Sequence, residues 1–324
     1  MAAGTEFRSR HPFAARCISR GTMIYFVTGA SGFIGKRLVR SLLTRPDATV
    51  YFLMREPSAE RLAKLSRFWG TDATRAIPLE GDLTQPGLGI APNDLDPIMS
   101  KVDHVFHLAA IYDLEADGAT EMRTNIEGTR NAVLFAMAVG AKHFHHMSSI
   151  AAAGLYHGVF REDMFAEAEE LEHPYFASKH ESEKVVREEC RIPWRIYRPG
   201  LVVGDSTSGE MDKVDGPYYF FKLIQKTRKL LPPWMPSIGF EGGRINLVPV
   251  DFVVAALIHL AHVEGEASML PNQSLGPRCH DVLPHADAFV CSLYGNSPLC
   301  GLPTLSPPAP SIIPTVLSPL SAGL

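Results

Sequence analysis

The stretch MIYFVTGASGFIG, residues 23–35, joins an apolar run to a turn rich in glycine. Its first half is short, apolar and partly β-branched, which is typical of a buried strand. Gly29, Gly32 and Gly35 follow in a G-x-x-G-x-x-G arrangement, and residues 33–45 carry apolar side chains at helical spacing. Glycines between a strand and a helix allow a tight turn and let backbone N–H groups approach a pyrophosphate. The stretch therefore predicts the first strand, turn and helix of a dinucleotide-binding fold.

Predicted strands and helices alternate from Met23 to about Gly265. The strands expected after the first are residues 49–55, 76–84, 104–110, 142–150 and 194–204. Helices are expected at 33–45, at 125–140, where Asn125 opens the helix and Gly140 closes it, at 173–190, and after Asp251, which is expected to cap an apolar helix. Six strands in this rhythm, without an internal repeat, predict an α/β fold with a doubly wound parallel sheet.

Composition narrows the class of protein. The 324 residues suit one large domain or one and a half, and a net charge of −4 gives no reason to expect nucleic-acid binding. Five cysteines show no metal-site spacing, so we expect a reduced, cytoplasmic setting. The apolar run 253–263 is too short to span a bilayer, so no transmembrane segment is expected. His143, His145 and His146 fall on a predicted strand that splits them between two faces, so no metal is expected either.

The two ends differ from the body. Residues 1–22 hold several arginines and one acid, and are interpreted as a disordered extension upstream of Met23 or as an organellar transit peptide. Residues 23–266 form the predicted nucleotide-binding domain. Residues 267–324 have little charge and frequent proline, and in residues 302–324 the prolines are placed so that neither a helix nor a central strand can form. We expect this tail to be disordered or translated out of frame, leaving a small, incomplete C-terminal substrate lobe.

The end of the second strand favours NADP(H) over NAD. An acidic residue at this place would bind a ribose 2′-hydroxyl. The chain instead has Arg55 there, with Lys36 just after the third glycine, and a guanidinium can pair with a 2′-phosphate through two charge-assisted hydrogen bonds. Glu56 is a nearby acid and keeps NAD open.

Several motifs together resemble a known family. TGASGFIG, GDL (81–83), HLAA (107–110), SS (148–149), YFASK (175–179) and RPG (198–200) follow the order and spacing of the extended short-chain dehydrogenases/reductases. The chain is most similar to the male-sterility and fatty acyl-CoA reductase branch. More narrowly, about residues 23–265 resemble the N-terminal reductase domain of bacterial two-domain fatty acyl-CoA reductases. The resemblance covers neither end.

The resemblance implies roles for individual residues. Asp82 would bind the adenine amine beside Leu83, and Ala109 and Ala110 would line the cofactor. Ser149 would be the catalytic hydroxyl, with Ser148 as the neighbouring alternative. Asn125 would order a water that contacts the lysine, or would only cap its helix. The implied cofactor-binding set is Gly29, Ser31, Gly32, Phe33, Ile34, Gly35, Arg55, Asp82, Leu83, Ala109, Ala110, Tyr175, Lys179 and Pro199.

Tyr175 and Lys179 lie four residues apart, so they face the same side of the predicted helix. Reduction of a carbonyl needs hydride at carbon and a proton at oxygen. A tyrosine has a pKa of about 10 in model peptides, and a nearby ammonium stabilises its phenolate. With Ser149 directing the substrate oxygen, the resemblance implies NADPH-dependent reduction of a fatty acyl-CoA or fatty aldehyde in lipid metabolism, the substrate being free or carried as a CoA or carrier-protein thioester.

Other functions remain open at this point. The same residues serve extended short-chain dehydrogenases that act on sterol-like or nucleotide-sugar substrates, because a fold does not fix its substrate. A non-catalytic nucleotide sensor is disfavoured by the presence of the Tyr–Lys pair. A fragment that binds nucleotide without turnover is a further alternative. Residues 215–236 combine aromatics with basic residues, which suggests either an apolar lid with a basic rim or a packing helix.

Overall fold

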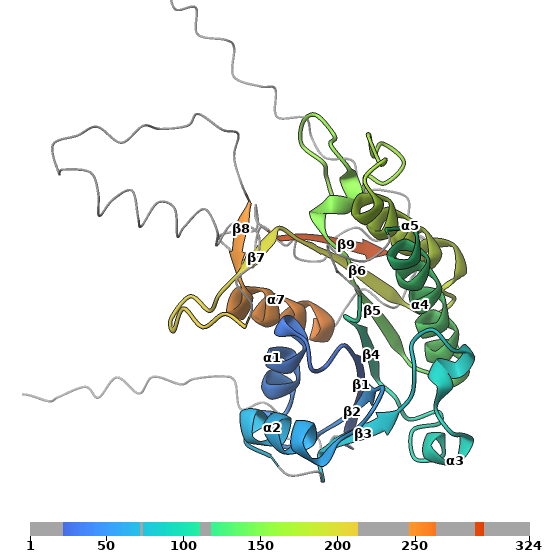
Figure 1. The fold of residues 1–324 in the computed structure, drawn as a ribbon, viewed down its shortest axis with the longest axis vertical. Helices are drawn as coiled ribbons and strands as arrows, with labels where there is room; N and C mark the ends of the chain where they lie inside the picture. The colour runs from blue at the N-terminus through green and yellow to red at the C-terminus, as the bar shows by residue number, and fades with distance from the viewer. Residues whose placement is uncertain (1–21, 72–73, 111–117, 213–245, 264–288, 295–324) are drawn as a thin grey trace, which may run out of the picture.

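The computed structural model describes residues 22–71, 74–110, 118–212, 246–263 and 289–294. Its main feature is a seven-stranded sheet in the order β3-β2-β1-β4-β5-β6-β9, seen in Figure 1. The strands are β1 Met23–Thr28, β2 Ala48–Met54, β3 Ala76–Glu80, β4 His104–His107, β5 His143–Met147, β6 Trp194–Pro199 and β9 Phe289–Tyr294. The first six are parallel, as predicted, and the chain reverses its direction of winding between β1 and β4. Ligands of such sheets bind at this switch point, outside the carboxyl ends of the strands.

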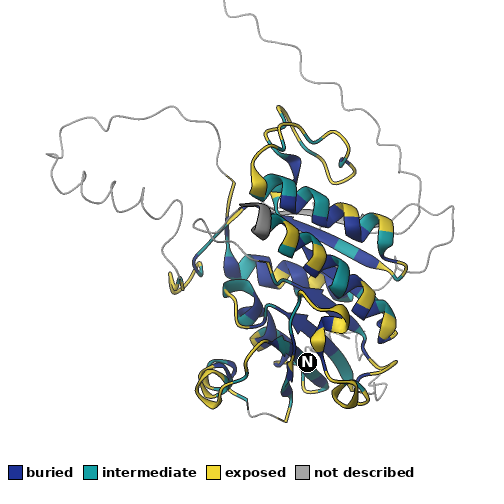
Figure 2. Ribbon diagram, turned by 45° about the vertical axis from the view of Figure 1, so that its right-hand side comes forward, coloured by how far each residue is buried: buried dark blue, intermediate teal, exposed yellow. Residues whose placement is uncertain are grey.

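Helices cover both faces of the sheet (Figure 1). The helices are α1 Phe33–Leu42, α2 Ala59–Trp69, α3 Pro92–Leu95, α4 Gly118–Ala138, α5 Pro174–Glu189 and α7 Val250–His262, with 3-10 turns η1 Pro86–Gly89 and η2 Ile150–Ala153. One apolar core joins α1, α2 and α7 to alternate side chains of β1 and β2, such as Tyr25 and Phe52. The other core joins α4 and α5 to the opposite faces, such as Phe26 and Phe144. The central strands are therefore buried on both sides, as Figure 2 shows in dark blue.

The expected strand 194–204 is wrong in one respect, because it breaks at Gly200. Residues beyond the break form β7 (Leu201–Val203), which pairs with β8 (Leu247–Pro249) in a separate two-stranded sheet. The Asn246 carbonyl accepts a hydrogen bond from the Leu201 N–H at 2.8 Å and lies where a Cβ on Gly200 would be. The approach of this second segment turns the chain out of the main sheet.

One stretch of the tail that was expected to be disordered or out of frame forms a strand. Residues 289–294 form β9, which pairs antiparallel with β6 from Trp194↔Tyr294 to Pro199↔Phe289. This stretch, FVCSLY, contains no proline, so every backbone N–H can take part in a strand. The rest of the predicted tail, like residues 1–21 and the aromatic and basic segment 215–236, lies outside the described residues.

Two helix ends differ from the expectations. Helix α4 begins at Gly118, so Asn125 lies inside the helix and is not its cap. The N-cap of α7 is Pro249, and Asp251 lies in the first turn, where its carboxylate accepts hydrogen bonds from the Ser206 N–H (2.9 Å) and hydroxyl (2.6 Å). Gly140 does follow the end of α4, with φ +66° and a hydrogen bond from its N–H to the Met137 carbonyl. Among the described helices, none is long and apolar enough to cross a membrane.

Candidate active site

The glycine turn lies at the switch point of the sheet and is tightly packed. Gly29 has φ +75°, and a Cβ there would lie 2.7 Å from the Ala109 nitrogen at the end of β4. A Cβ on Gly35 would overlap with the Gly29 carbonyl oxygen. Gly32 is the N-cap of α1 and makes no side-chain cap, so no side chain of its own occupies the place in front of the first helical N–H groups. This geometry fits a pyrophosphate, which needs close backbone approach and a free helix N-terminus.

The other expected nucleotide-contacting residues lie at the carboxyl ends of neighbouring strands. Arg55 follows β2, is exposed, and forms no hydrogen bond or ion pair with the part of the chain that the structure describes. Asp82 follows β3, and its Oδ1 accepts hydrogen bonds from the Thr84 N–H (2.8 Å) and hydroxyl (2.9 Å). The backbone hydrogen bond from Thr84 holds the pKa of Asp82 below its usual range, and the Arg55 charge acts in the same direction. Asp82 is therefore an ionised acceptor.

Three further members of the expected set differ in exposure. Leu83 is half-buried, its side chain packs where a Cβ on Gly128 would be, and its carbonyl accepts a hydrogen bond from the Asn131 amide at 2.9 Å. Ala110, at the end of the described part of the β4 loop, is exposed. Pro199 is buried and is the last residue of β6.

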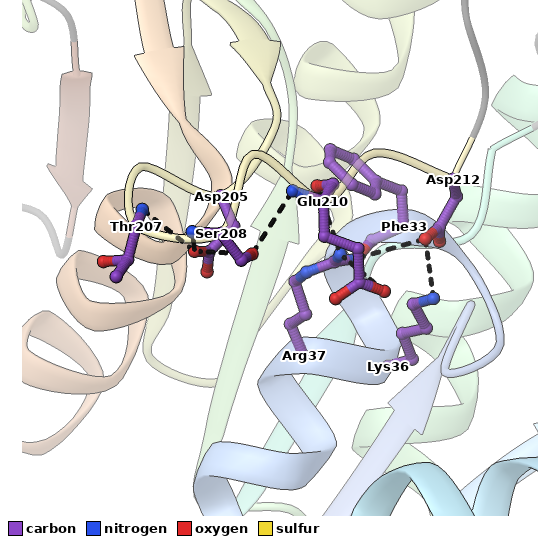
Figure 3. A network of polar contacts seen from close by, with 8 residues as sticks. All are labelled: Phe33, Lys36, Arg37, Asp205, Thr207, Ser208, Glu210 and Asp212. Carbon is purple, nitrogen blue, oxygen red and sulfur yellow. Dashed lines mark hydrogen bonds and ion pairs between the residues drawn. The ribbon is translucent and has the colours of Figure 1, made fainter.

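Lys36 points toward an acidic loop (Figure 3). Its ammonium donates to Asp212 Oδ1 at 2.7 Å and lies 4.6 Å from the centre of the Phe68 ring. The neighbouring Arg37 is 4% exposed, and its guanidinium lies 3.5 Å from Glu210 Oε1 and 3.6 Å from Asp212 Oδ1. The loop after β7 thus covers the first turn of α1, and it already holds one of the two cations expected near the nucleotide.

Helix α5 carries the Tyr–Lys pair. Pro174 is its first residue, and the His173 Nδ1 caps it by accepting from the Tyr175 N–H at 3.2 Å. Lys179 is 8% exposed, with its Nζ 6.0 Å from the centre of the Tyr175 ring. The next residue, His180, donates from Nδ1 to the Ala152 carbonyl at 3.0 Å and so ties α5 to η2.

Ser149 is the N-cap of η2, and its Oγ accepts a hydrogen bond from the Ala151 N–H at 3.2 Å. Because η2 packs on α5, the structure brings the element that begins with Ser149 to the helix that carries Tyr175 and Lys179. Asn125 is 6% exposed on α4, which packs along α5. The expected catalytic residues therefore come from η2, α5 and α4, and both η2 and α4 pack on α5.

A buried ion pair lies behind these residues. Glu183 and Arg198 are 0% and 1% exposed and are joined by contacts of 2.6, 2.9 and 3.2 Å. The Ser148 hydroxyl donates to Glu183 Oε1 at 2.6 Å, and Arg198 Nη1 donates to the Met164 carbonyl at 3.0 Å. The cluster fixes the ends of β5 and β6 to α5, one turn beyond Lys179. The sequence alone predicted no role for Glu183 or for an ion pair with Arg198. Two features could have indicated the pair: Glu183 lies four residues after Lys179 on the same helix, and Arg198 is a charged residue within a mostly apolar strand.

A second polar cluster joins β1, β4 and α4 around His107. Its Nδ1 lies 2.8 Å from Thr28 Oγ1 and its Nε2 lies 3.1 Å from Thr129 Oγ1. Burial lowers the pKa of His107 to about 3, and the Lys179 charge acts in the same direction. The sequence placed His107 in the HLAA motif but predicted no role for it, because its partners are distant along the chain.

Other histidines of the sheet are buried without forming a metal site. Among the described residues, no group of three possible ligands could hold a metal ion. His104 and His145 face the α7 side, where His104 Nδ1 lies 2.9 Å from His145 Nε2, and His146 faces α5. Burial lowers the pKa of His104 to about 2 and those of His145 and His146 well below their ordinary value. With His107, these are the four buried imidazoles of β4 and β5.

Comparisons with known proteins identify the family of the chain. A family model described as "Male sterility protein" matches residues 27–257. The chain is 32% identical over 253 residues to a linear gramicidin synthase of Brevibacillus parabrevis, covering 74% of this chain and 5% of that protein. It is 31% identical over 291 residues to the L-2-aminoadipate reductase large subunit of Penicillium chrysogenum, covering 78% of this chain and 20% of that protein. It therefore spans only a small part of these two relatives.

A solved structure gives the same result at the level of the fold. The terminal R domain from the myxalamid PKS-NRPS biosynthetic pathway superimposes with a TM-score of 0.61 at 25% identity, over 76% of this chain and 64% of that one. Because the family model matches residues 27–257 and the fold superimposes on this reductase domain, the chain is a member of the male sterility protein family, within the extended short-chain dehydrogenase/reductase group of oxidoreductases that bind a nicotinamide dinucleotide.

Proposed function

We propose that this chain reduces the carbonyl of an acyl thioester or aldehyde with NADPH. The observation that carries the proposal is the placement of buried Lys179 beside Tyr175, on a helix tied through His180 to the turn that Ser149 begins. The relatives support a carbonyl reductase: one is named as an L-2-aminoadipate reductase, and one structure is a terminal R domain from a PKS-NRPS pathway. A fatty chain on the substrate remains the expectation from the sequence motifs.

The residues of this chain would divide the chemistry among them. Ser149 would donate a hydrogen bond to the substrate oxygen and direct it toward Tyr175. Tyr175 would give its proton to that oxygen, while the Lys179 ammonium stabilises the resulting phenolate. When bound, the nicotinamide supplies the hydride that the carbonyl carbon receives. The products are an aldehyde and a free thiol from a thioester, or an alcohol from an aldehyde.

We also propose that Arg55 selects NADPH. Lys36 is held by Asp212, so of the two cations expected beside the ribose, Arg55 is the one without a carboxylate partner in the described structure. A guanidinium can hold a 2′-phosphate through two charge-assisted hydrogen bonds.

The test is NADPH oxidation with a panel of an acyl-CoA, a fatty aldehyde and a sterol ketone, with wild type and Tyr175→Phe. Turnover of the first two substrates is expected, with a loss of roughly 10²-fold or more in Tyr175→Phe and nearly unchanged NADPH binding. Phe176→Leu, which alters the aromatic residue next to the tyrosine on α5, is the matched control and should keep turnover within about threefold. Full activity in Tyr175→Phe would reject the assignment, and NADPH binding without oxidation of any substrate would favour a nucleotide-binding fragment.

A further inference from the structure

A continuous line of hydrogen bonds connects the nucleotide turn to the helix of Asn125. The Ala109 N–H donates to Thr28 Oγ1 at 3.3 Å, and Thr28 Oγ1 lies 2.8 Å from His107 Nδ1. On the other side of the ring, His107 Nε2 lies 3.1 Å from Thr129 Oγ1, which donates to the Asn125 carbonyl at 2.8 Å. His107, Thr28 and Thr129 are each at most 2% exposed.

One end of this chain of hydrogen bonds is the Ala109 N–H, which can only donate, and the other is the Asn125 carbonyl, which can only accept. Together they determine which atom donates in every bond between them. A carbonyl oxygen can only accept, so the Thr129 hydroxyl must donate its single proton to the Asn125 carbonyl. Thr129 Oγ1 must then accept from His107, which places the ring proton on Nε2. The Nδ1 of the neutral ring is left as an acceptor, so Thr28 must donate to it while accepting from the Ala109 N–H. The arrangement requires a neutral imidazole, and burial of His107 favours that form.

The two ends of this chain of hydrogen bonds lie at the nucleotide turn and at the helix that carries Asn125, and the proposed function requires both to be held in position. Thr28 directly precedes Gly29, and Ala109 is the residue whose backbone a Cβ on Gly29 would strike, so one end holds the two walls of the nucleotide turn together. The other end attaches α4 to the sheet at Thr129, one helical turn from Asn125, and α4 packs along the helix that carries Lys179. A hydroxyl bonded to the carbonyl one turn earlier is common in helices. The bond from His107 is what ties that turn of α4 to β4.

We propose that His107 is a positioning residue that sets the nucleotide turn through Thr28 and sets α4 with Asn125 through Thr129. The inference rests on the proposed function for its second half, since Asn125 matters only where the Tyr–Lys pair acts. The first half concerns nucleotide binding alone.

Two substitutions of His107 each remove one of its two hydrogen bonds and keep the other. In His107→Asn, the amide oxygen can take the place of Nδ1 and accept from Thr28, but the side chain is too short to reach Thr129. In His107→Gln, the terminal amide nitrogen can take the place of Nε2 and donate to Thr129, but no acceptor remains for Thr28. His107→Gln should therefore weaken NADPH binding by roughly 3- to 10-fold and leave kcat at saturating NADPH within about twofold. His107→Asn should leave the Kd for NADPH within about twofold and lower kcat by roughly 3- to 10-fold.

Valine variants of the threonines test each link without disturbing the ring. Valine has the shape of threonine and lacks the hydroxyl, so Thr28→Val should lower NADPH affinity at least as much as His107→Gln, because it also removes the acceptor of the Ala109 N–H. Thr129→Val should repeat the effect of His107→Asn. Adding His107→Gln to Thr28→Val should lower the affinity by less than a further factor of about two, because Thr28→Val has already removed the bond that His107→Gln breaks. His145→Asn, a buried histidine on the opposite face of the sheet with partners His104 and Tyr197, is the control for loss of stability alone and should leave the Kd unchanged.

Failure of the proposed function and failure of the proposal for His107 give different results. Titration of NADPH fluorescence needs no substrate, so absence of turnover in the wild type would refute the proposed function while the Thr28 half is still measured. Equal effects of His107→Asn and His107→Gln on Kd and on kcat, or full additivity of Thr28→Val with His107→Gln, would overturn the proposal. Folded Thr28→Val protein with wild-type affinity would overturn it as well.

Discussion

Removal of one charge from the buried Glu183–Arg198 pair should destabilise this protein far more than removal of a similar charge at the surface. In Glu183→Gln, the Arg198 guanidinium keeps its charge but loses a partner bonded to it by contacts of 2.6, 2.9 and 3.2 Å. Both side chains are at most 1% exposed, so no water can replace the carboxylate. Breaking a buried ion pair on one side costs about 3–5 kcal/mol, because the charge left behind remains desolvated.

The same helix supplies a matched control. Glu189 also binds an arginine Nε through both carboxylate oxygens, at 2.9 and 3.0 Å from Arg130, but both side chains are 34% exposed. Exposed pairs contribute about 0.2–1 kcal/mol, so Glu189→Gln should be nearly neutral. The two substitutions are chemically identical, and each removes a carboxylate that binds an arginine Nε through both oxygens. Glu183 also accepts from the Ser148 hydroxyl at 2.6 Å, and Arg130 keeps Glu127 as a second partner at 3.2 Å, so these two differences act in the same direction as burial.

Urea unfolding followed by the fluorescence of the buried Trp69 and Trp194 measures both changes. The expected difference of about 3 kcal/mol or more corresponds to a fall in Tm of roughly 6–12 °C for a domain of this size. A double variant, Glu183→Leu with Arg198→Met, removes both charges and should lose less than the sum of the single losses, since neither charge is left unpaired. If Glu183→Gln unfolds within about 1 kcal/mol of Glu189→Gln, or if the double variant loses the full sum, the reasoning from burial is refuted.

Three further predictions concern the nucleotide turn, the cofactor and acid. Gly35→Ala places a methyl group on the Gly29 carbonyl and should lower NADPH affinity by more than about 10-fold, whereas Gly70→Ala, with open space around its Cβ, should leave affinity unchanged; equal binding by the Gly35 variant would contradict the turn geometry. Arg55→Ala should raise the Kd for NADPH by roughly 10-fold and leave that for NADH within about twofold, and a parallel loss with both would exclude a contact to the 2′-phosphate. The four buried imidazoles are neutral in the folded state, with the pKa of His104 at about 2 and that of His107 at about 3, whereas an unfolded histidine has a pKa near 6.5. Below about pH 6.5 the unfolded state therefore binds protons at these imidazoles and the folded state does not. The free energy of unfolding should be at its maximum above about pH 7 and should fall at lower pH by up to about 1.4 kcal/mol per pH unit for each imidazole. Unchanged urea midpoints between about pH 7 and pH 5 would contradict this.

The positions of β1 and β2 were predictable because each is a short, mostly apolar run with clear flanking turns, whereas β4, β5 and β6 also carry histidines or arginines and were predictable from their place in the alternation of strands and helices. The end of β6 was not, since the break at Gly200 depends on the approach of Asn246 from a distant segment. For β9 the local sequence carries only a proline-free apolar window, and its pairing with β6 is a long-range contact. Local patterns indicate which residues can form a strand, whereas the neighbour of a strand is decided by tertiary packing.

In the candidate site, too, local motifs were predictable from the sequence and contacts between residues distant along the chain were not. The glycine turn and the Tyr175–Lys179 spacing are local, so the sequence predicted both. The partners of His107 are 79 and 22 residues away, and Asp212 reaches Lys36 across 176 positions, so no local pattern marks either contact. Lys36 was expected near the nucleotide on the basis of position, and its pairing with Asp212 became visible only in three dimensions.

The span of the Lys36–Asp212 contact also bears on the order in which the protein folds. Contacts between residues so far apart close late, because the loop entropy must be overcome before the contact contributes stability. The first turn of α1 would therefore acquire its cover from the acidic loop only after the six parallel strands have assembled. Amide protons at the start of α1 should accordingly exchange through local opening of that loop, at a lower free energy than those of β1 and β4, which exchange only when the sheet comes apart.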